Sequence, residues 1–579
     1  MSVFFNGRLL TTPTVETMVN DSGLAPQTTR VGNALALIGL SEAGIPKRPT
    51  VIRNIAHARQ VLRGGELLFA CEKAFAPSAE TGSPGVLYAV RVNPATPSTL
   101  TLKDGSSNNV IVLASTDYGL HTNDLMVKVE AGSVTGKKVT TGRGGQTYVG
   151  DNLARSILTL TYTGAKDIAT VSVSNTQLVL STSLTVPGPD DPVVLTLTLS
   201  EFPTVQQLVE RLRNVADWTV TMTDGVGLLP TINALDTLTA ANAKAGAVSV
   251  TGHLQVIIDW INSTFESFLT ATRAANAGAV PANIGFTYLT GGNNGSATNT
   301  DWSDALEALQ AEDVQWIVPL SAASAVWGLT DAHCQYMSSL GRRERRCFVG
   351  GATGLDIESA AADAASLNSD RTAYVYPGFY DYNTSGGLTL YPAYQLAAMV
   401  GAAFASLTPG EPLTRKSLRI RGLEQPLAEP SDTDYLIRNG VFSVFQNTRG
   451  SYMVVKSITT WRANENYNRV EVSVGAALDY VVRSVRERME QFIGRKAAFT
   501  SLKSIVEETA SVLRSLAQAE PYGLGLLAGD ANNPPFRNIS AEIAGDTVRL
   551  TFECSPVIPI NYILVTVYAN AYSGSYTVL

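Results

Sequence analysis

Val314-Gln315-Trp316-Ile317-Val318-Pro319-Leu320 is a short, mostly apolar run that predicts a buried strand. Strand and helix patterns alternate on both sides of it, which predicts βαβ units and a mainly parallel sheet covered by helices. We expect strands at 284–289, 346–350 and 373–377, and helices at 301–309, 324–343, 357–367 and 391–407.

The sheet is expected to draw on an earlier part of the chain as well. Val31 to Leu40 and Gly85 to Val92 are compact apolar runs, and Ala56 to Phe69 between them has a helical pattern. We therefore predict one discontinuous α/β core sheet flanked by helices, formed by residues 27–93 and 284–465.

Residues 94–283 have a different texture, with apolar residues alternating with Thr or Ser in several short runs. This period of two is typical of half-buried strands. A helical pattern follows at 204–215. Because insertions are best tolerated in exposed loops, we predict an inserted β-rich domain that faces outward.

The last part of the chain predicts an α+β C-terminal domain at 466–568. Helical patterns cover 476–492 and 500–517, and a hairpin pattern surrounds Gly545-Asp546. Ile558 to Tyr568 reads as a strong strand. With expected terminal arms at 1–26 and 569–579, the fold class is a multidomain α/β protein.

Composition excludes several classes of protein. At 579 residues the chain exceeds what one hydrophobic core usually supports, and 45% hydrophobic residues indicate a globular protein. A net charge of −7 argues against sequence-independent nucleic-acid binding. We expect no membrane-spanning segment and no signal sequence, so the protein is expected to be made and assembled in a cytoplasm. The cysteines Cys71, Cys334, Cys347 and Cys554 are expected to be reduced thiols, since no C-x-x-C pair occurs.

The sequence contains no complete motif for catalysis, metal binding or cofactor binding. The turn Gly291-Gly292-Asn293-Asn294-Gly295 has neither the order nor the lysine of a phosphate loop, and Gly132 to Lys138 is one residue short of one. None of the four histidines has metal-ligand spacing, and the G-x-S-x-G elbow is absent. We expect a protein that is not an enzyme and that binds no cofactor or metal.

Several segments together resemble the contractile tail sheath proteins of bacteriophages. The resemblance is carried by the order and spacing of short segments over roughly half of the chain. They are the glycine-rich turn at 291–295, the strand at 314–319 and the segments 392–402, 413–418, 422–424, 434–441 and 458–461, together with the Asn532-Asn533-Pro534 turn and the rest of the C-terminal region.

This resemblance implies a structural subunit of the virion tail that polymerises as a helical tube around the tail tube and contracts to drive it through the host envelope. The implied partners are further copies of the chain, the tail tube protein, and baseplate and terminator proteins, with no nucleic acid and no membrane insertion. A sheath from a phage-tail-like bacteriocin or a type VI-like system is the alternative, and an α/β enzyme is a third possibility.

Two sets of residues are expected to carry the assembly. The family implies strand exchange between subunits, which places the first set in the termini, although the C-terminal strand also has the alternative of pairing inside its own domain. The second set is the charged face of the helix at 476–492, for which the resemblance implies contact with the tube by salt-sensitive pairing; the alternative is the solvent-exposed side of an ordinary packed amphipathic helix. The sets are Val3, Phe4, Phe5, Ile560, Tyr562, Leu564, Thr566 and Tyr568, and Arg483, Arg486, Glu487, Arg488 and Glu490.

The densest charge run, Arg342-Arg343-Glu344-Arg345-Arg346, has two interpretations. It is either a solvated helix end, where cations meet the negative end of the dipole, or an interface with an acidic patch on a neighbouring subunit. We favour the solvated helix end.

Overall fold

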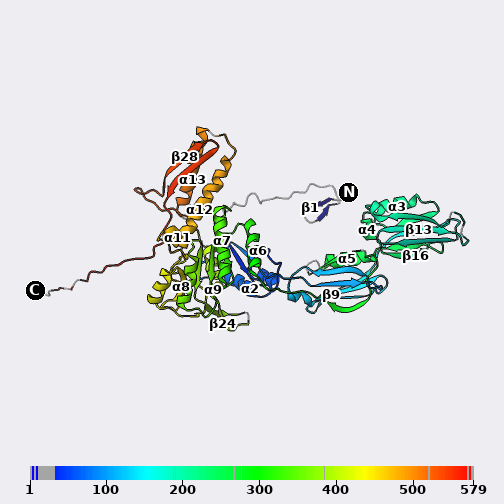
Figure 1. The fold of residues 1–579 in the computed structure, drawn as a ribbon, viewed down its shortest axis with the longest axis horizontal. Coiled ribbons are helices and arrows are strands. Elements are labelled where there is room, and N and C mark those ends of the chain that lie inside the picture. The colour runs from blue at the N-terminus through cyan, green and yellow to red at the C-terminus, as the bar shows by residue number, and fades with distance from the viewer. Residues whose placement is uncertain are drawn as a thin grey trace.

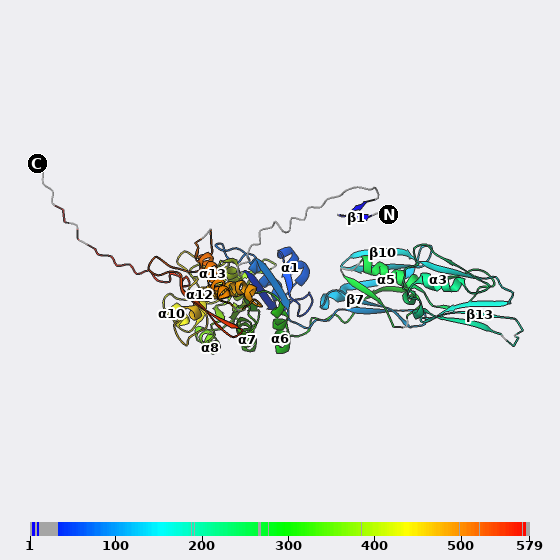
Figure 2. The same ribbon diagram turned by 90° about the horizontal axis from the view of Figure 1, so that it is seen from above.

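The computed structural model of the protein describes residues 3–5, 8–10, 33–186, 188–189, 191–264, 268–275, 277–383, 385–496, 498–519, 522–569, 571 and 573–574. Figure 1 shows a central body with two lobes extending from it on one side and the C-terminal segment leaving on the other. Figure 2 shows the same arrangement from above. Most of the two expected terminal arms, at 1–26 and 569–579, lies outside the described residues.

The central body is built on an eight-stranded sheet with the order β27-β26-β22-β21-β20-β3-β5-β4. Its six inner strands are parallel, and the edge strands β4 and β27 are antiparallel to their neighbours. Every residue of β3, β20, β21 and β22 is buried, as expected for parallel strands covered on both faces. The bounds are β3 Ala34–Gly39, β4 Thr50–Ile52, β5 Val86–Arg91, β20 Trp316–Pro319, β21 Arg346–Gly350, β22 Thr372–Tyr376, β26 Val441–Gln446 and β27 Tyr452–Val454.

Helices cover both faces of this sheet and form two separate hydrophobic clusters. The expectation of a discontinuous α/β sheet flanked by helices is thus confirmed. The first face is covered by α1 Ile55–Leu62, α2 Glu66–Ala74 and α9 Ala393–Ser406, and the second by α6 Asn299–Ala308, α7 Ser324–Ser339, α8 Ile357–Leu367 and α10 Ser431–Arg438.

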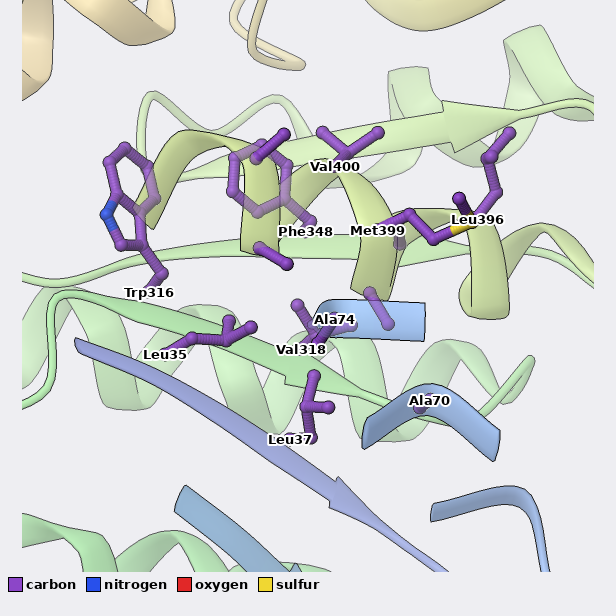
Figure 3. Close-up of a cluster of buried hydrophobic side chains, with 14 of the residues drawn as sticks. Leu35, Leu37, Ala70, Ala74, Trp316, Val318, Phe348, Leu396, Met399 and Val400 are labelled. Carbon is purple, nitrogen blue, oxygen red and sulfur yellow. The ribbon is translucent and has the colours of Figure 1, made fainter. Parts of the chain in front are cut away.

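Helix α9 is the centre of the first face. Figure 3 shows Leu396, Met399 and Val400 of α9 beside side chains from three strands, with Ala70 and Ala74 of α2 close by. The small residues of α9 permit this close approach: a Cβ on Gly401 would lie 2.9 Å from Val318 Cγ2. A small three-stranded sheet, β23 Phe379–Tyr382, β24 Leu388–Tyr391 and β25 Gly422–Leu423, adjoins the carboxyl ends of the strands.

The inserted region is β-rich, as expected, but it forms two lobes with separate cores. The inner lobe, next to the central body, contains the sheets β18-β7-β6 and β10-β9-β8-β19 and helix α5. Its bounds are β6 Thr99–Lys103, β7 Asn109–Ser115, β8 Leu125–Ala131, β9 Lys137–Arg143, β10 Gln146–Leu153, α5 His253–Thr264, β18 Leu269–Arg273 and β19 Ile284–Tyr288.

The outer lobe lies at the far end of the molecule in both views. Two sheets with the orders β15-β11-β17 and β14-β13-β12-β16 enclose its core, and the helix predicted at 204–215 is present as α3. The bounds are β11 Ser156–Tyr162, β12 Ile168–Val173, β13 Gln177–Ser183, β14 Val193–Thr198, α3 Val205–Arg213, β15 Trp218–Met222, α4 Thr231–Ala234, β16 Leu238–Asn242 and β17 Val248–Thr251.

One expected strand belongs to a different sheet. The run at 284–289 was assigned to the central sheet, but β19 pairs antiparallel with β8 of the inner lobe, so that assignment was wrong. Phe286 and Tyr288 are 52% and 55% exposed. An edge strand of an antiparallel sheet leaves such side chains outside, whereas the inner strands of the parallel sheet are buried.

The C-terminal domain consists of two long helices and a hairpin. The first helix begins four residues earlier than expected, and residues 490–492 of its predicted range form a separate 3-10 turn. The predicted hairpin is confirmed, with Gly545 at φ 65 in its turn. The bounds are α11 Tyr467–Val470, α12 Val472–Met489, α13 Phe499–Ala517, β28 Phe536–Ala544 and β29 Thr547–Cys554.

The strand predicted at Ile558 to Tyr568 is absent. Residues 557–569 are all described, and none of them has strand structure. The alternative that this segment pairs inside its own domain is therefore wrong. An apolar alternation forms a strand only when another strand supplies its hydrogen bonds, and no strand in the described part of the chain does so.

Candidate functional site

The segment from Ile558 to Tyr568, termed the C-terminal segment, is an extended apolar stretch without cover from the described residues. The exposed fraction is 83% for Ile560, 76% for Tyr562 and 95% for Leu564. Ile563, Val565, Val567 and Tyr568 are exposed to a similar degree. Contiguous exposed apolar surface of this kind marks an interaction site.

The root of the C-terminal segment is held to the body at defined points. The backbone N–H of Val557 donates to the Leu526 carbonyl over 3.0 Å, and Asn561 Nδ2 donates to Glu471 Oε1 over 2.8 Å. Lys456 Nζ lies 3.4 Å from Glu471 Oε1 and 5.8 Å from the centre of the Tyr562 ring. Burial raises the pKa of the Glu471 carboxyl, although Lys456 and Asn561 oppose the shift. The segment therefore leaves the molecule from a fixed position.

The hairpin β28–β29 is a two-stranded sheet whose outer edges carry no further strand among the described residues. Phe536, Ile539, Leu550 and Phe552 pack toward the core of the C-terminal domain, which contains α12 and α13. Two strands alone are marginally stable, and open strand edges are templates for added strands. The hairpin can therefore accept an extended segment at either edge.

The N-terminal site residues lie in a separate small sheet. β1 Val3–Phe5 pairs antiparallel with β2 Arg8–Leu10, with Val3 opposite Leu10, and these strands pair with no other described strand. The structure does not bring β1 together with the C-terminal segment, since the two lie on opposite sides of the central body in both views.

The charged residues of α12 form ion pairs within the chain. Arg483 Nη2 lies 2.5 Å from Asp313 Oδ2, and Arg486 Nη2 lies 2.5 Å from Glu344 Oε1. Both carboxylates belong to the central body, so these arginines join α12 to it. Burial opposes the charge on Arg483, but hydrogen bonds to Asp313 and Glu487 outweigh burial and raise the pKa.

The remaining predicted residues of this face point more to the outside. Arg488 Nε lies 2.7 Å from Glu508 Oε2 of α13, and the Arg488 side chain is still 53% exposed. Glu487 and Glu490 are exposed. The outward part of the predicted tube-contact set is therefore Glu487, Arg488 and Glu490.

The charge run at 342–346 is not a solvated helix end, because α7 already ends at Ser339. It is not a free interface either, because two arginines of the run are buried. Arg345 is 0% exposed and donates to the carbonyls of Leu309 and Glu312 over 2.9 and 2.5 Å. Arg343 donates to the neighbouring carbonyls of Gln310 and Ala311. These cations donate hydrogen bonds to the backbone carbonyls at the end of α6 and its 3-10 extension, where the helix dipole is negative.

The neighbouring Arg346 has a different role. Its Nε lies 2.8 Å from Asp479 Oδ2 of α12, and Arg371 Nη1 lies 2.7 Å from the same oxygen. A buried cation bridged in this way fixes α12 against the sheet. A local charge run gives no signal for this arrangement, because Asp479 is distant in sequence.

A crevice of about 890 Å³ lies at the carboxyl ends of β3 and β20, where α/β proteins commonly bind ligands. Ser41 and Ser321 line it, together with the carboxylates Glu42 and Glu66. Glu66 accepts a hydrogen bond from the Tyr394 hydroxyl over 2.9 Å. The lining includes no histidine or cysteine, and within the described part of the chain no three His, Cys, Asp or Glu side chains form a possible metal site.

The glycine-rich turn at 291–295 is a structural joint beside this crevice. Asn294 Oδ1 accepts from Arg91 Nη2 over 3.2 Å and from the Leu120 N–H over 3.1 Å. Gly295 has φ 69, and a Cβ there would lie 2.6 Å from the Pro94 carbonyl oxygen. The second near-match to a phosphate loop, at 132–138, lies in the hairpin between β8 and β9 rather than between a strand and a helix. Among the helices of the described residues, none is long and apolar enough to cross a membrane.

Comparison with known proteins gives a consistent result. The family described as "Phage tail sheath protein central domain" matches residues 295–460, which begin after β19. The tail sheath protein of Bacillus phage SP01 is 28% identical over 99% of this chain and 98% of its own length. The putative tail sheath protein of Enterococcus phage phiEF24C is 27% identical over 97% of both chains.

Solved structures show a similar fold. The sheath tail protein of Listeria innocua superposes with a TM-score of 0.54 at 14% identity, covering 91% of this chain and 93% of that one. The sheath tail protein of Desulfitobacterium hafniense has a TM-score of 0.52 at 12% identity, covering 94% of this chain and 100% of that one.

Proposed function

We propose that the chain is a phage tail sheath protein, and that its copies polymerise as a helical tube around a tail tube and contract to drive that tube through the host envelope; the matches to the family model and to three phage tail sheath proteins support this. The chain is a structural subunit of a contractile sheath in the virion tail. In this proposal it is assembled in the host cytoplasm, with baseplate and terminator proteins at the ends of the polymer.

The observation that carries the proposal is an exposed apolar segment and a hairpin with open edges on one chain, which we propose as strand donor and strand acceptor. The C-terminal segment is apolar, extended and exposed, and the hairpin β28–β29 has open edges among the described residues. A donor on one subunit that fits an acceptor on the next makes a heterologous contact, which generates a helical polymer when it does not close into a ring.

The register of the donor follows from the alternation of a strand. Its alternate positions are Ile560, Tyr562, Leu564, Thr566 and Tyr568, so all five project to one face of an added strand. That face would extend the apolar face of the hairpin. Val3, Phe4 and Phe5 form the second proposed donor, and the second open edge of the hairpin leaves room for it.

Contraction in this proposal needs no nucleotide and no catalytic step. Converting one isolated two-state unit almost completely requires about 5.5 kcal/mol. In a cooperative lattice a smaller bias per subunit is enough, because neighbours switch together. The exchanged strands keep the lattice connected while the subunits move as rigid bodies, and the tube and baseplate hold the extended form in place.

Contact with the tail tube is assigned to the outward part of the α12 face. Glu487, Arg488 and Glu490 remain exposed, whereas Arg483 and Arg486 are engaged with carboxylates of the central body. Exposed ion pairs are screened by salt, so this contact should weaken as ionic strength rises.

The alternative of a phage-tail-like bacteriocin or type VI-like sheath shares the same assembly mechanism. The matches to phage proteins over 97–99% of this chain, including the two-lobed insertion, favour a phage tail. The enzyme hypothesis has the 890 Å³ crevice in its favour, but the described residues that line the crevice include no histidine or cysteine to act as a base or a thiol nucleophile.

The test is negative-stain electron microscopy of the concentrated full chain and of a variant that lacks residues 560–579. We expect long hollow tubes from the full chain and discrete particles from the truncated one, with the same circular dichroism spectrum for both monomers. Normal tubes from the truncated chain would overturn the strand-donor proposal, and particles from both would overturn self-assembly.

A further inference from the structure

A cavity of about 170 Å³ lies where the central body meets the inner lobe. Arg63, directly after α1, lines it from the central body, and Arg143, at the end of β9, lines it from the inner lobe. Thr141 and Phe268 of the inner lobe also contribute to its wall. The cavity is large enough for several waters at about 30 Å³ each, or for one small ligand.

Two polar atoms in this wall are buried and have no hydrogen-bond partner among the described residues. They are Nη2 of Arg143 and Oγ1 of Thr141, and Thr141 as a whole is only 1% exposed. The Arg143 guanidinium lies 5.8 Å from the centre of the Phe268 ring. A buried donor left unpaired destabilises the folded state, and more so when it is charged. A ligand that accepts hydrogen bonds would remove this cost.

The charge of the cavity also favours an acceptor. Burial, and next the nearby charge of Arg63, lower the pKa of Arg143. Asp117 and Asp124 act in the opposite direction, but Asp117 already accepts hydrogen bonds from the His121 ring and from the Gly44 and Tyr118 backbones. Among the described residues that line the cavity, none carries a carboxylate.

A neighbouring cavity, which Arg63 also lines, provides a contrast. The other two cations of that cavity have carboxylate partners within the chain: Arg59 Nε lies 2.6 Å from Glu72 Oε1, and Lys73 pairs with Asp381. Arg63 and Arg143 have no such ion pair in the described residues. Within the described part of the chain, neither arginine forms an ion pair, and the two carboxylates that act on Arg143, Asp117 and Asp124, do not line the cavity.

We propose that this cavity binds an oxyanion, with Arg143 and Arg63 as its charged donors and Thr141 as a hydroxyl donor. The planar guanidinium group presents paired N–H donors that match the oxygen atoms of a phosphate or a carboxylate. The oxyanion comes either from free phosphate or from a carboxylate side chain of a neighbouring copy. In both cases it joins the central body to the inner lobe and stiffens the base of the insertion.

The test for free phosphate uses thermal unfolding of the full-length monomer in sodium phosphate and in sodium chloride of equal ionic strength. A ligand that binds only the folded state raises Tm with concentration. We expect phosphate to raise Tm in the wild type and in the control Arg213→Gln, an exposed arginine of the outer lobe. The half-saturating concentration should rise at least tenfold in Arg143→Gln and in Arg63→Gln, and Arg63→Gln alters only an exposed side chain.

The test for a neighbour's carboxylate rests on the proposed polymerisation and is read by light scattering. If phosphate has no specific effect on Tm, the proposal requires Arg63→Gln and Arg143→Gln to polymerise more slowly than Arg213→Gln. Equal phosphate effects in all variants, or no phosphate effect together with equal polymerisation, would overturn the site. Loss of polymerisation in every variant and in the wild type would instead count against the proposed function, because the thermal test does not depend on it.

Discussion

The central sheet and the C-terminal segment are both apolar and extended, yet they differ in what covers them. Strand β3 is buried along its whole length between two layers of helices, whereas Leu564 is 95% exposed. The central sheet forms its backbone hydrogen bonds and buries its side chains within the chain, whereas the C-terminal segment does neither. The difference teaches that an apolar strand pattern specifies the need for a partner but not the molecule that supplies it.

The largest loss of stability should come from the buried side of this comparison. Phe348 is 0% exposed and stacks on Trp316 and Phe404 at centroid distances of 5.5 and 5.3 Å. We expect Phe348→Ala to lower the free energy of unfolding by about 3–5 kcal/mol through the cavity it leaves. Urea denaturation measures this, and a loss below about 1 kcal/mol would mean that the stack does not support the core.

The junction between α12 and the central body should give the next largest effect. Asp479→Ala leaves the buried Arg346 without its carboxylate. Breaking a buried ion pair in this way typically lowers the free energy of unfolding by about 3–5 kcal/mol. The loss should be smaller here because Arg371, the second arginine that contacts Asp479, is partly exposed. Glu487→Ala on the same helix is the matched control and should change stability by less than about 0.5 kcal/mol. Equal effects of the two changes in urea denaturation would contradict the assigned role of Asp479.

A smaller, pH-dependent effect is expected at the root of the C-terminal segment. Burial raises the folded-state pKa of Glu471 above its unfolded value, so its protonated form favours the folded protein. This contribution is fully present below the unfolded pKa of about 4.3 and is lost as pH rises through the folded pKa. Glu471→Gln should remove this pH dependence, changing the difference in Tm from the wild type between pH 4 and pH 7. If the difference in Tm between the variant and the wild type were constant from pH 4 to pH 7, the raised pKa of Glu471 would be contradicted.

The smallest effect on the monomer, and the clearest test of the comparison, should come from the exposed side. The double change Ile560→Asp and Leu564→Asp should alter the free energy of unfolding by less than about 0.5 kcal/mol, since both side chains are exposed. It should nevertheless prevent polymerisation, whereas Leu228→Asp, an exposed apolar residue of the outer lobe, should not. Electron microscopy distinguishes these outcomes, and tubes from the double variant would show that the apolar face is not the donor.

Much of the central fold could be predicted from sequence because its strands are buried on both faces. Runs such as Trp316 to Pro319 and Arg346 to Gly350 are short and nearly continuous, and helical patterns separate them. The hairpin around Gly545 was equally clear, because its turn and its alternation agree. In each case the deciding interactions lie close in sequence or repeat with a simple period.

The features that could not be predicted depend on residues far apart in the chain. β19 pairs with β8 across more than a hundred residues, and Arg346 meets Asp479 in the same way. The two-lobed insertion was expected as one domain, because period-two patterns do not reveal which strands share a core. The cationic cavity has no local signal either, since Arg63 and Arg143 lie on different parts of the fold.

The way in which the insertion is attached has a consequence for how such chains diversify. The outgoing and returning strands lie side by side: the N–H of Thr96 donates to the Asn293 carbonyl over 2.9 Å, and that of Thr99 donates to the Thr290 carbonyl over 2.8 Å. The two ends of a segment of nearly two hundred residues therefore meet at one point on the body, and closing them requires little chain entropy whatever lies between. The two inserted lobes can therefore be enlarged, replaced or shortened to a turn without a change in the strand order of the central sheet.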